Sequence, residues 1–187
     1  MQKQAELAPL LALLMRLRPQ RVLEIGTAHG GTLWAWCRVA GEDATVVSVD
    51  LPGGPFGGKG YDASFLRTFA GPRQTLELLA ADSHLTETRA QVQALLGGPV
   101  DFLFIDGDHS YDGVTTDYDM YAPLVRRGGL VAFHDIVPGA PELVGEVPRF
   151  WKELCEQPGA REIVDDIGSG GTEIEGCFGI GLLTRLR

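Results

Sequence analysis

The sequence of 187 residues lacks three features that would each indicate a particular class of protein. Its 16 lysine and arginine residues are outnumbered by 25 aspartate and glutamate residues, which gives a net charge of −9. Because this charge repels phosphate backbones and anionic lipid surfaces, nucleic acid and membranes are poor candidates for partners. The chain also has no apolar run long enough to cross a bilayer. We therefore expect neither a nucleic-acid-binding protein nor a membrane protein.

Cysteine is scarce and follows no pattern. Cys37, Cys155 and Cys177 are odd in number, widely spaced and unlike a set of metal ligands. These properties argue against a disulfide framework and favour reduced thiols in a cytoplasmic protein. The length suits one domain with a sizeable core, and 44% apolar residues are ordinary for a globular chain. We expect a single domain over residues 1–187.

Within the first 18 residues, Leu7–Met15 resembles the apolar core of a signal peptide, but it is followed by Arg16 and Arg18 and lacks a small-residue cleavage pattern. Leucines recur there at helical spacing, so one face of a helix is apolar. The sequence predicts an amphipathic helix that packs on the edge of the domain. The leucines of this face are Leu7, Leu10, Leu11, Leu14 and Leu17.

Apolar segments alternate with segments of helical composition along the rest of the chain. Unbroken apolar strands separated by helices are typical of a mostly parallel sheet covered on both faces, a doubly wound α/β fold. Two further extended runs, 162–167 and 178–184, are joined by a short glycine-rich link and predict an antiparallel pair. The expected parallel strands are 21–25, 45–49, 74–80, 100–105 and 130–133, and the expected helices are 31–40, 61–70, 85–96, 111–125 and 147–156.

A glycine-bearing turn follows the first predicted strand. Gly26 and Gly30 remove side chains where the backbone must pass close to a ligand, and the helix that begins near Gly31 offers unpaired N–H groups. This handover from strand to helix is typical of a nucleotide-binding α/β unit. A tight connection that binds no ligand is the alternative.

Polar residues also follow each of the later parallel strands. The carboxyl ends of parallel strands share one edge of a sheet, so we expect these residues to gather there. Asp50 lies about 20 residues past the glycine turn, where a carboxylate can accept both hydroxyls of a ribose. Asp82 and Ser83 either contact a base or cap a helix. The glycine-rich residues 51–60 form either a flap over the site or a long connection.

In combination, these motifs resemble the class I S-adenosylmethionine-dependent methyltransferases. The matching segments are 23–31, Asp50, Asp82–Ser83, 104–111 and 124–135. The last two are similar to a subgroup of small-molecule O-methyltransferases acting on sugars and natural products. The resemblance covers about residues 21–183, with Ala28 at the middle position of the glycine motif. It implies a Rossmann-like, mostly parallel seven-stranded sheet with an antiparallel last strand.

The resemblance also implies a set of cofactor contacts. Glu24 would hold the methionine amino group, directly or through water, and Gly26 would lie against the cofactor. The cofactor-binding residues expected for S-adenosylmethionine are Glu24, Gly26, Thr27, Ala28, Gly30, Asp50, Leu51, Asp82, Ser83 and Asp106.

A divalent metal is implied by the same relatives. In catechol O-methyltransferase-like enzymes, magnesium is held by an aspartate after the fourth strand and by an acid and an amide after the fifth. Asp106 matches the first position, and His134 and Asp135 occupy the other two. Oxygen ligands suit Mg²⁺, which would orient and deprotonate a substrate hydroxyl. The imidazole of His134 instead favours Mn²⁺, Fe²⁺ or Zn²⁺, or no ion.

His109 lies three residues beyond Asp106, where those relatives carry a lysine that acts as a base. An imidazole with a near-neutral pKa can accept the proton of a hydroxyl as its oxygen is methylated. The alternative is that His109 only forms a hydrogen bond within its loop. Asp106 and His109 are the expected catalytic residues.

The first functional hypothesis is methyl transfer to a small hydroxylated molecule. An NAD-dependent oxidoreductase shares the glycine turn and the ribose acid, but the spacing of the turn and the residues from Asp106 to His109 argue against it. A module that binds S-adenosylmethionine without catalysis is the third possibility. The acceptor, the metal and the oligomeric state stay undetermined by the sequence, and a homo-oligomer could complete the acceptor pocket.

Overall fold

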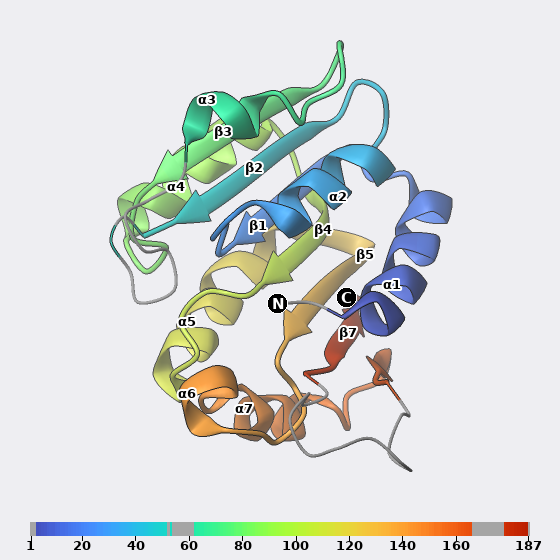
Figure 1. Ribbon diagram of the computed structural model, residues 1–187, viewed down its shortest axis with the longest axis vertical. Coiled ribbons are helices and arrows are strands. Elements are labelled where there is room, and N and C mark those ends of the chain that lie inside the picture. The colour runs from blue at the N-terminus through green and yellow to red at the C-terminus, as the bar shows by residue number, and fades with distance from the viewer. Residues whose placement is uncertain (1–2, 52, 54–61, 166–177, 187) are drawn as a thin grey trace.

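A computed structural model describes residues 3–51, 53, 62–165 and 178–186 (Figure 1). Seven strands form one sheet in the order β3-β2-β1-β4-β5-β7-β6. β1 to β5 are parallel, and β7 runs antiparallel to both β5 and β6. The predicted α/β fold with a reversed last strand is therefore confirmed. The strands are β1 Arg21–Ile25, β2 Thr45–Asp50, β3 Thr75–Ala80, β4 Val100–Ile105, β5 Val125–His134, β6 Ala160–Ile163 and β7 Ile180–Thr184.

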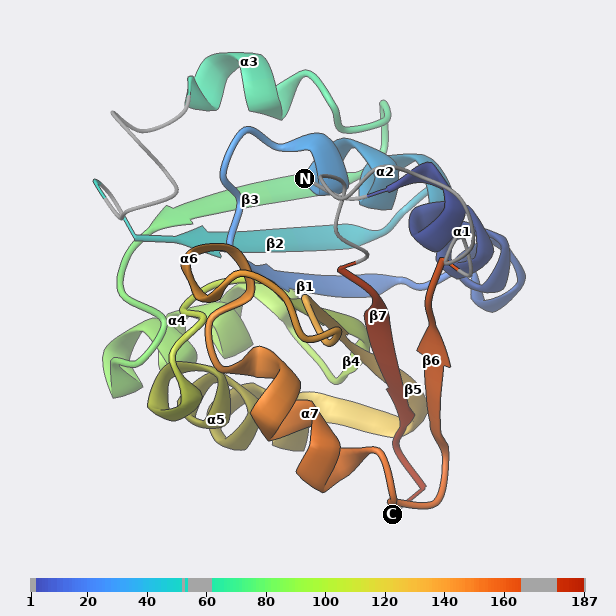
Figure 2. The same ribbon diagram turned by 60° about the horizontal axis from the view of Figure 1, so that its bottom comes forward.

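Helices cover both faces of the sheet. Figure 2 shows α1, α2 and α3 on one face and α4, α5 and α7 on the other. The central strands are buried on both sides because each face carries its own apolar cluster. The helices are α1 Gln4–Leu17, α2 Gly31–Val39, α3 Ala63–Arg67, α4 Thr86–Leu96, α5 Tyr111–Tyr121, the 3₁₀ turn η1 Ala122–Leu124, α6 Pro141–Val144 and α7 Val147–Leu154.

The predicted N-terminal amphipathic helix is present as α1. Leu10 and Leu14 are fully buried, and Leu7, Leu11 and Leu17 pack against the same cluster as α2. In the described part of the chain, none of the helices combines the length and the apolar character needed to cross a membrane.

The structure differs from the predicted elements around β5. This strand begins at Val125, five residues before the predicted start, and so includes residues 125–129. Arg126 pairs with Asp101 of β4, and the register shifts between Val100 and Phe102, so the pairing continues through an irregular stretch. This ion pair joins residues far apart in the sequence, so local periodicity does not predict this part of the strand.

The C-terminal antiparallel pair is confirmed with a shifted first strand. β6 covers Ala160–Ile163 rather than 162–167, and Ile163 pairs with Ile180. The predicted glycine-rich link at 168–171 lies outside the described residues, as does most of the predicted flap at 51–60.

Candidate active site

A cavity of about 330 Å³ lies at the carboxyl ends of β1, β2, β3 and β4. The expected gathering of strand-end residues at one edge is therefore observed. A hollow of about 380 Å³ at the opposite edge, beside Arg38 and Arg73, contains none of them. The cavity is lined by Ile25, Gly26, Ala28, Val49, Asp50, Leu51, Ala81, Asp82, Ser83, His84, Asp106, Gly107, Asp108 and His109.

The turn after β1 requires glycine for a structural reason. Gly26 has a φ of 95°, and a Cβ built on it would lie 2.0 Å from the carbonyl oxygen of Asp106. Only a residue without a side chain lets this turn cross the end of β4. The crossing is held on the other side as well, because the Gly26 N–H donates to the carbonyl of Val49. Gly26 thus joins the ends of three strands at the cavity.

Asp50 and the glycine turn form one unit. The backbone N–H groups of Thr27, Ala28 and Leu51 lie close enough to the Asp50 carboxylate to favour its charged form. Burial raises the pKa of Asp50 above its usual value, and these three donors oppose part of that rise. The carboxylate is therefore held at a defined place beside the turn, with its side chain lining the cavity.

Glu24 lies beneath the cavity and does not line it. Its Oε1 accepts a hydrogen bond from Trp36 Nε1 at 2.7 Å, and its Oε2 accepts one from Ser48 Oγ at 2.6 Å. The Ser48 hydroxyl lies 2.6 Å from that of Thr27. Because Glu24 is fully buried among neutral donors, desolvation raises its pKa to about 7. We call Glu24, Thr27, Trp36 and Ser48 the buried floor.

Three of the ten expected cofactor residues are set back from the cavity. Glu24 and Thr27 belong to the buried floor, and Gly30 faces α3, where an added Cβ would lie 2.5 Å from Leu66 Cδ2. The absence of a side chain at Gly30 thus makes room for α3. The other seven line the cavity: Gly26, Ala28, Asp50, Leu51, Asp82, Ser83 and Asp106.

Asp82 and Ser83 do not cap the helix that follows them, so the capping alternative is excluded. α4 begins after Leu85 without a side-chain cap, and Asp82 Oδ1 instead accepts the N–H of His84 at 2.8 Å. The Ser83 carbonyl accepts the hydroxyl of Tyr121 at 2.7 Å. Both residues therefore shape the loop after β3 and leave side chains at the cavity wall.

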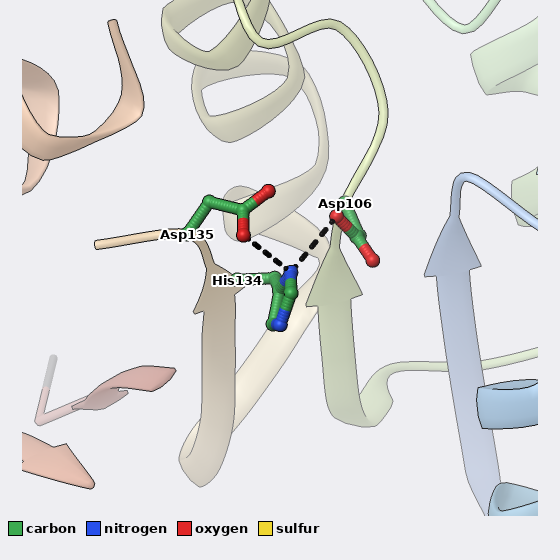
Figure 3. A group of neighbouring side chains, drawn as sticks. All are labelled: Asp106, His134 and Asp135. Atoms are coloured by element: carbon green, nitrogen blue, oxygen red, sulfur yellow. Dashed lines mark ion pairs between the residues drawn. The ribbon is translucent and has the colours of Figure 1, made fainter. Parts of the chain in front are cut away.

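Asp106, His134 and Asp135 meet at the ends of β4 and β5 (Figure 3). The pairing of Ile105 with Phe133 brings the two strand ends side by side. His134 Nδ1 lies 2.9 Å from Asp135 Oδ1 and 3.4 Å from Asp106 Oδ1. One ligand atom from each residue lies within 4.8 Å of the others. Asp135 has a φ of 62°, a strained conformation for a residue with a side chain.

His109 completes this group, which we call the His/Asp cluster. Its Nε2 lies 3.4 Å from Asp106 Oδ1 and 3.5 Å from Asp135 Oδ2. Its Nδ1 lies 2.8 Å from the carbonyl oxygen of Leu143. A carbonyl can only accept, so Nδ1 must carry a proton, and in the neutral ring Nε2 has the free lone pair. The hydrogen bond of His109 thus leaves its loop, and it orients the ring toward the two carboxylates.

The charges of the His/Asp cluster support one another. Burial alone would raise the pKa of Asp106, but hydrogen bonds and charge interactions with His109 and His134 lower it to about 2. Burial likewise disfavours charged His134, yet Asp106 and Asp135 raise its pKa to about 10. The carboxylates raise the pKa of His109 in the same way, against its burial. The carboxylates and the imidazoles of this group therefore favour the charged forms of one another.

The α6 turn contacts His109 and was not predicted from the sequence. Beside the hydrogen bond from His109 to Leu143, the Glu146 N–H donates to the carbonyl of His109 at 2.8 Å. A Cβ on Gly145, whose φ is 53°, would lie 2.3 Å from the same carbonyl oxygen. Pro141 at the start of α6 and Gly145 just past its end are the signal that predicts such a turn.

The mixed sheet and the cavity at its carboxyl edge define a Rossmann-like α/β protein whose cavity lies where the strand order reverses. A family model described as a methyltransferase domain matches residues 23–136. The chain belongs to this methyltransferase family. Membership decides against the oxidoreductase alternative.

Individual relatives are more distant. The chain is 29% identical over 142 residues to the uncharacterized protein y4gI of Sinorhizobium fredii; the match covers 74% of this chain but 15% of that protein's length. The O-methyltransferase TomG of Streptomyces achromogenes, involved in tomaymycin synthesis and solved with SAM, matches at a TM-score of 0.67 and 21% identity, covering 97% of this chain and 79% of that one. MycE of the mycinamycin pathway, solved with Mg and SAH, matches at a TM-score of 0.62 and 20% identity. The match covers 96% of this chain and 48% of the MycE chain.

Proposed function

We propose that the protein is an S-adenosylmethionine-dependent methyltransferase that methylates a hydroxyl oxygen of a small molecule. The observation that carries this proposal is that the cavity and the His/Asp cluster share Asp106 and His109. A donor bound in the cavity would therefore lie next to groups able to activate an acceptor. The family assignment and the similarity to the O-methyltransferase TomG and the methyltransferase MycE support the same interpretation.

The cavity suits a nucleoside cofactor. Asp50, which lines the cavity beside the glycine turn, is placed to accept ribose hydroxyls, and Asp82 and Ser83 lie one strand further along for the base. The tight crossing of Gly26 and Asp106 leaves backbone at the cavity wall for the amino acid part. We assign Glu24, Thr27 and Gly30 an indirect role, since they support the turn from behind. Bound S-adenosylmethionine supplies an electrophilic methyl group.

The His/Asp cluster fits a divalent metal. Two carboxylate oxygens and an imidazole nitrogen face one another within 4.8 Å, which is a plausible ligand set. Asp106, His134 and Asp135 would hold the ion, and the nitrogen ligand favours Mn²⁺, Fe²⁺ or Zn²⁺ over Mg²⁺. A bound ion would lower the pKa of an acceptor hydroxyl. Because the pKa of His134 is about 10, ion binding at neutral pH must displace a proton from its ring.

His109 is the proposed base. Its Nε2 is directed to the space between Asp106 and Asp135, and its Nδ1 is held by the Leu143 carbonyl. The proton of the acceptor hydroxyl would pass to Nε2, and the resulting imidazolium would be stabilised by both carboxylates. The chain's main contributions are thus alignment of the two reactants and removal of this proton.

Two measurements test the proposal in sequence. Calorimetry should show that the protein binds S-adenosylhomocysteine, and that Asp50→Ala weakens this binding by about 10-fold or more. Methyl transfer from labelled S-adenosylmethionine into a mixture of hydroxylated metabolites should then fall on chelation and recover with one divalent ion. Folded protein that does not bind S-adenosylhomocysteine would contradict the proposal, and binding without transfer to any acceptor would support a non-catalytic module.

The remaining expectations are also proposals. The free thiols of Cys37 and Cys155 are compatible with a cytoplasmic protein, and the acidic composition with a small-molecule partner rather than nucleic acid or a membrane. We propose that residues 1–187 act as one methyltransferase domain, because both apolar clusters share one sheet. A homo-oligomer that completes the acceptor pocket is a further proposal.

A further inference from the structure

The cavity wall formed by the loop after β3 contains a histidine, His84, that has no role in the proposed methyl transfer. His84 lines the cavity beside Asp82 and Ser83, and 29% of its side chain is exposed. Its ring is directed by a residue of α5, on the other side of the wall. His84 Nε2 lies 3.5 Å from Oδ1 of Asp117.

Asp117 is an unusual residue for a helix that packs on a sheet. It is fully buried, and neither of its carboxylate oxygens accepts a hydrogen bond from the described residues. A buried carboxylate without a donor is costly, so the residue requires compensation by a positive group. Among the described residues, Asp117 forms its ion pair with His84.

The position of Asp117 relates it to the cavity. A Cβ placed on Gly107, a cavity-lining residue, would lie 3.3 Å from Asp117 Oδ2. The carboxylate therefore lies directly behind the cavity wall. Gly107 separates it from the cavity. His84 is the group that carries its charge to the cavity surface.

The loop that carries His84 is held at the two residues before it, Asp82 and Ser83. The His84 N–H donates to Asp82 Oδ1 at 2.8 Å, and the Ser83 carbonyl accepts the Tyr121 hydroxyl at 2.7 Å. Tyr121 is fully buried and lies one helical turn beyond Asp117 on α5. Two residues on one face of α5 thus fix the height and the orientation of the loop, which is the preorganisation expected of a binding group rather than of a solvent-exposed connection.

We propose that His84, positioned by Asp117, binds the base of the nucleoside cofactor and determines its base specificity. This inference rests on the proposed function, since it places a purine at the β3 end of the cavity, next to the ribose acid Asp50. With Nε2 paired to Asp117, Nδ1 is the nitrogen left for a ligand. Nδ1 donates to a ring nitrogen of adenine when the imidazole is protonated, and it accepts a hydrogen bond from the 6-amino group when the imidazole is neutral.

The charges near His84 agree with a donor role. The Asp117 carboxylate beside the ring raises the pKa of His84, and burial opposes this rise only in part. Asp82 and Asp108 add further negative charge around the ring. A protonated imidazole offers N–H at both nitrogens, one for Asp117 and one for the ligand.

The test compares affinities for three ligands that differ only in the base. The dissociation constants of S-adenosylhomocysteine, S-inosylhomocysteine and the 7-deaza analogue of S-adenosylhomocysteine are measured by calorimetry. The first analogue changes the edge at positions 1 and 6, and the second removes the acceptor at position 7. We expect wild type to prefer the adenosyl ligand over at least one analogue by about 10-fold or more, because the hydrogen bond between His84 and the base is lost.

The variants separate a contact from a structural role. His84→Ala should reduce that preference to near 1, and His84→Gln, which keeps a side-chain N–H donor, should restore part of it. Asp117→Asn should reduce the preference through the same ring, and its melting temperature shows whether it folds. Leu85→Ala is the matched control, because Leu85 is exposed next to His84 in the same loop but does not line the cavity. It should keep the wild-type preference.

The outcomes distinguish the two proposals. If wild type binds S-adenosylhomocysteine but shows no preference among the three ligands, or if His84→Ala keeps the wild-type preference, the assignment of His84 is overturned and the proposed function stands. If His84→Ala weakens all three ligands by the same factor, His84 acts structurally and the assignment is again overturned. If wild type binds none of them, both proposals fail together.

Discussion

Glu24 and Asp106 are two buried carboxylates on neighbouring strands, and their surroundings give them opposite properties. Glu24 pairs in register with Phe104, two residues before Asp106. Neutral donors surround Glu24 in the buried floor, so desolvation prevails and its pKa rises to about 7. Two imidazoles surround Asp106 in the His/Asp cluster, and its pKa falls to about 2. Burial is common to both, so the charge of the partners decides the protonation state.

This difference separates support from chemistry. The buried floor ties β1, β2 and α2 together through hydrogen bonds that carry no compensating positive charge. The His/Asp cluster concentrates charge on residues that reach the cavity from two strand ends. We therefore expect substitutions in the His/Asp cluster to change turnover and substitutions in the buried floor to change stability.

The largest effect should come from Asp135→Asn. This change removes a negative charge from the proposed metal site but keeps the shape of the side chain, so the turnover number should fall by about 10³-fold. Mn²⁺ binding, followed by electron paramagnetic resonance, should weaken in parallel. Ser48→Ala in the buried floor is the control and should keep turnover within about 10-fold of wild type. An Asp135→Asn protein with normal turnover would remove the distinction between the two regions.

Glu24→Gln should change how stability depends on pH. The folded pKa of about 7 exceeds the reference value of 4.5, so the folded state retains a proton that the unfolded state has released. The free energy of unfolding contributed by Glu24 is therefore present below pH 4.5 and is lost as the pH rises through about 7, by roughly 3 kcal/mol.

Urea denaturation of wild type and Glu24→Gln between about pH 5 and pH 8 measures this contribution. The advantage of wild type over the variant should shrink as the pH rises, because glutamine does not titrate. Parallel curves for the two proteins would show that Glu24 is not neutral in the folded state at low pH.

His109→Gln should lower the turnover number by about 10²-fold, because the proposed base is lost. The dissociation constant of S-adenosylhomocysteine should stay close to wild type, since the cavity keeps Asp50 and the glycine turn. A burst experiment that separates methyl transfer from product release locates the loss in the chemical step. A variant that weakens cofactor binding but turns over normally would assign His109 to the cavity rather than to the His/Asp cluster.

Gly145→Ala should have the smallest effect and acts through position alone. Its Cβ would press on the His109 carbonyl, so the ring should move relative to Asp106 and Asp135. We expect about a 10-fold lower turnover number with cofactor affinity unchanged. Gly139→Ala is the control, because a Cβ there meets Val144 at an ordinary distance of 3.4 Å. Equal losses in both variants would mean that the α6 turn does not position His109.

The extent of successful prediction follows the range of the interactions involved. The strand at 100–105 and the helix at 85–96 are set by apolar runs and near-neighbour propensities, and both were predicted within one or two residues. The start of β5 lies where Arg126 pairs with Asp101, a contact between residues far apart in the sequence. The α6 turn was not predicted, although Pro141 and Gly145 indicate it. The roles of the individual site residues stay predictions for experiment.

The sequence by itself determined the alternation of strands and helices, the glycine turn and the polar residue at each strand end, because these depend on spacing and local backbone chemistry. Only the tertiary structure decided that Glu24 lies under the cavity, that His109 is oriented by Leu143, and that Asp117 stands behind His84. Those facts depend on burial and on contacts between residues far apart in the chain. Local patterns do not contain them, because the partner of a buried polar group is chosen when the layers pack.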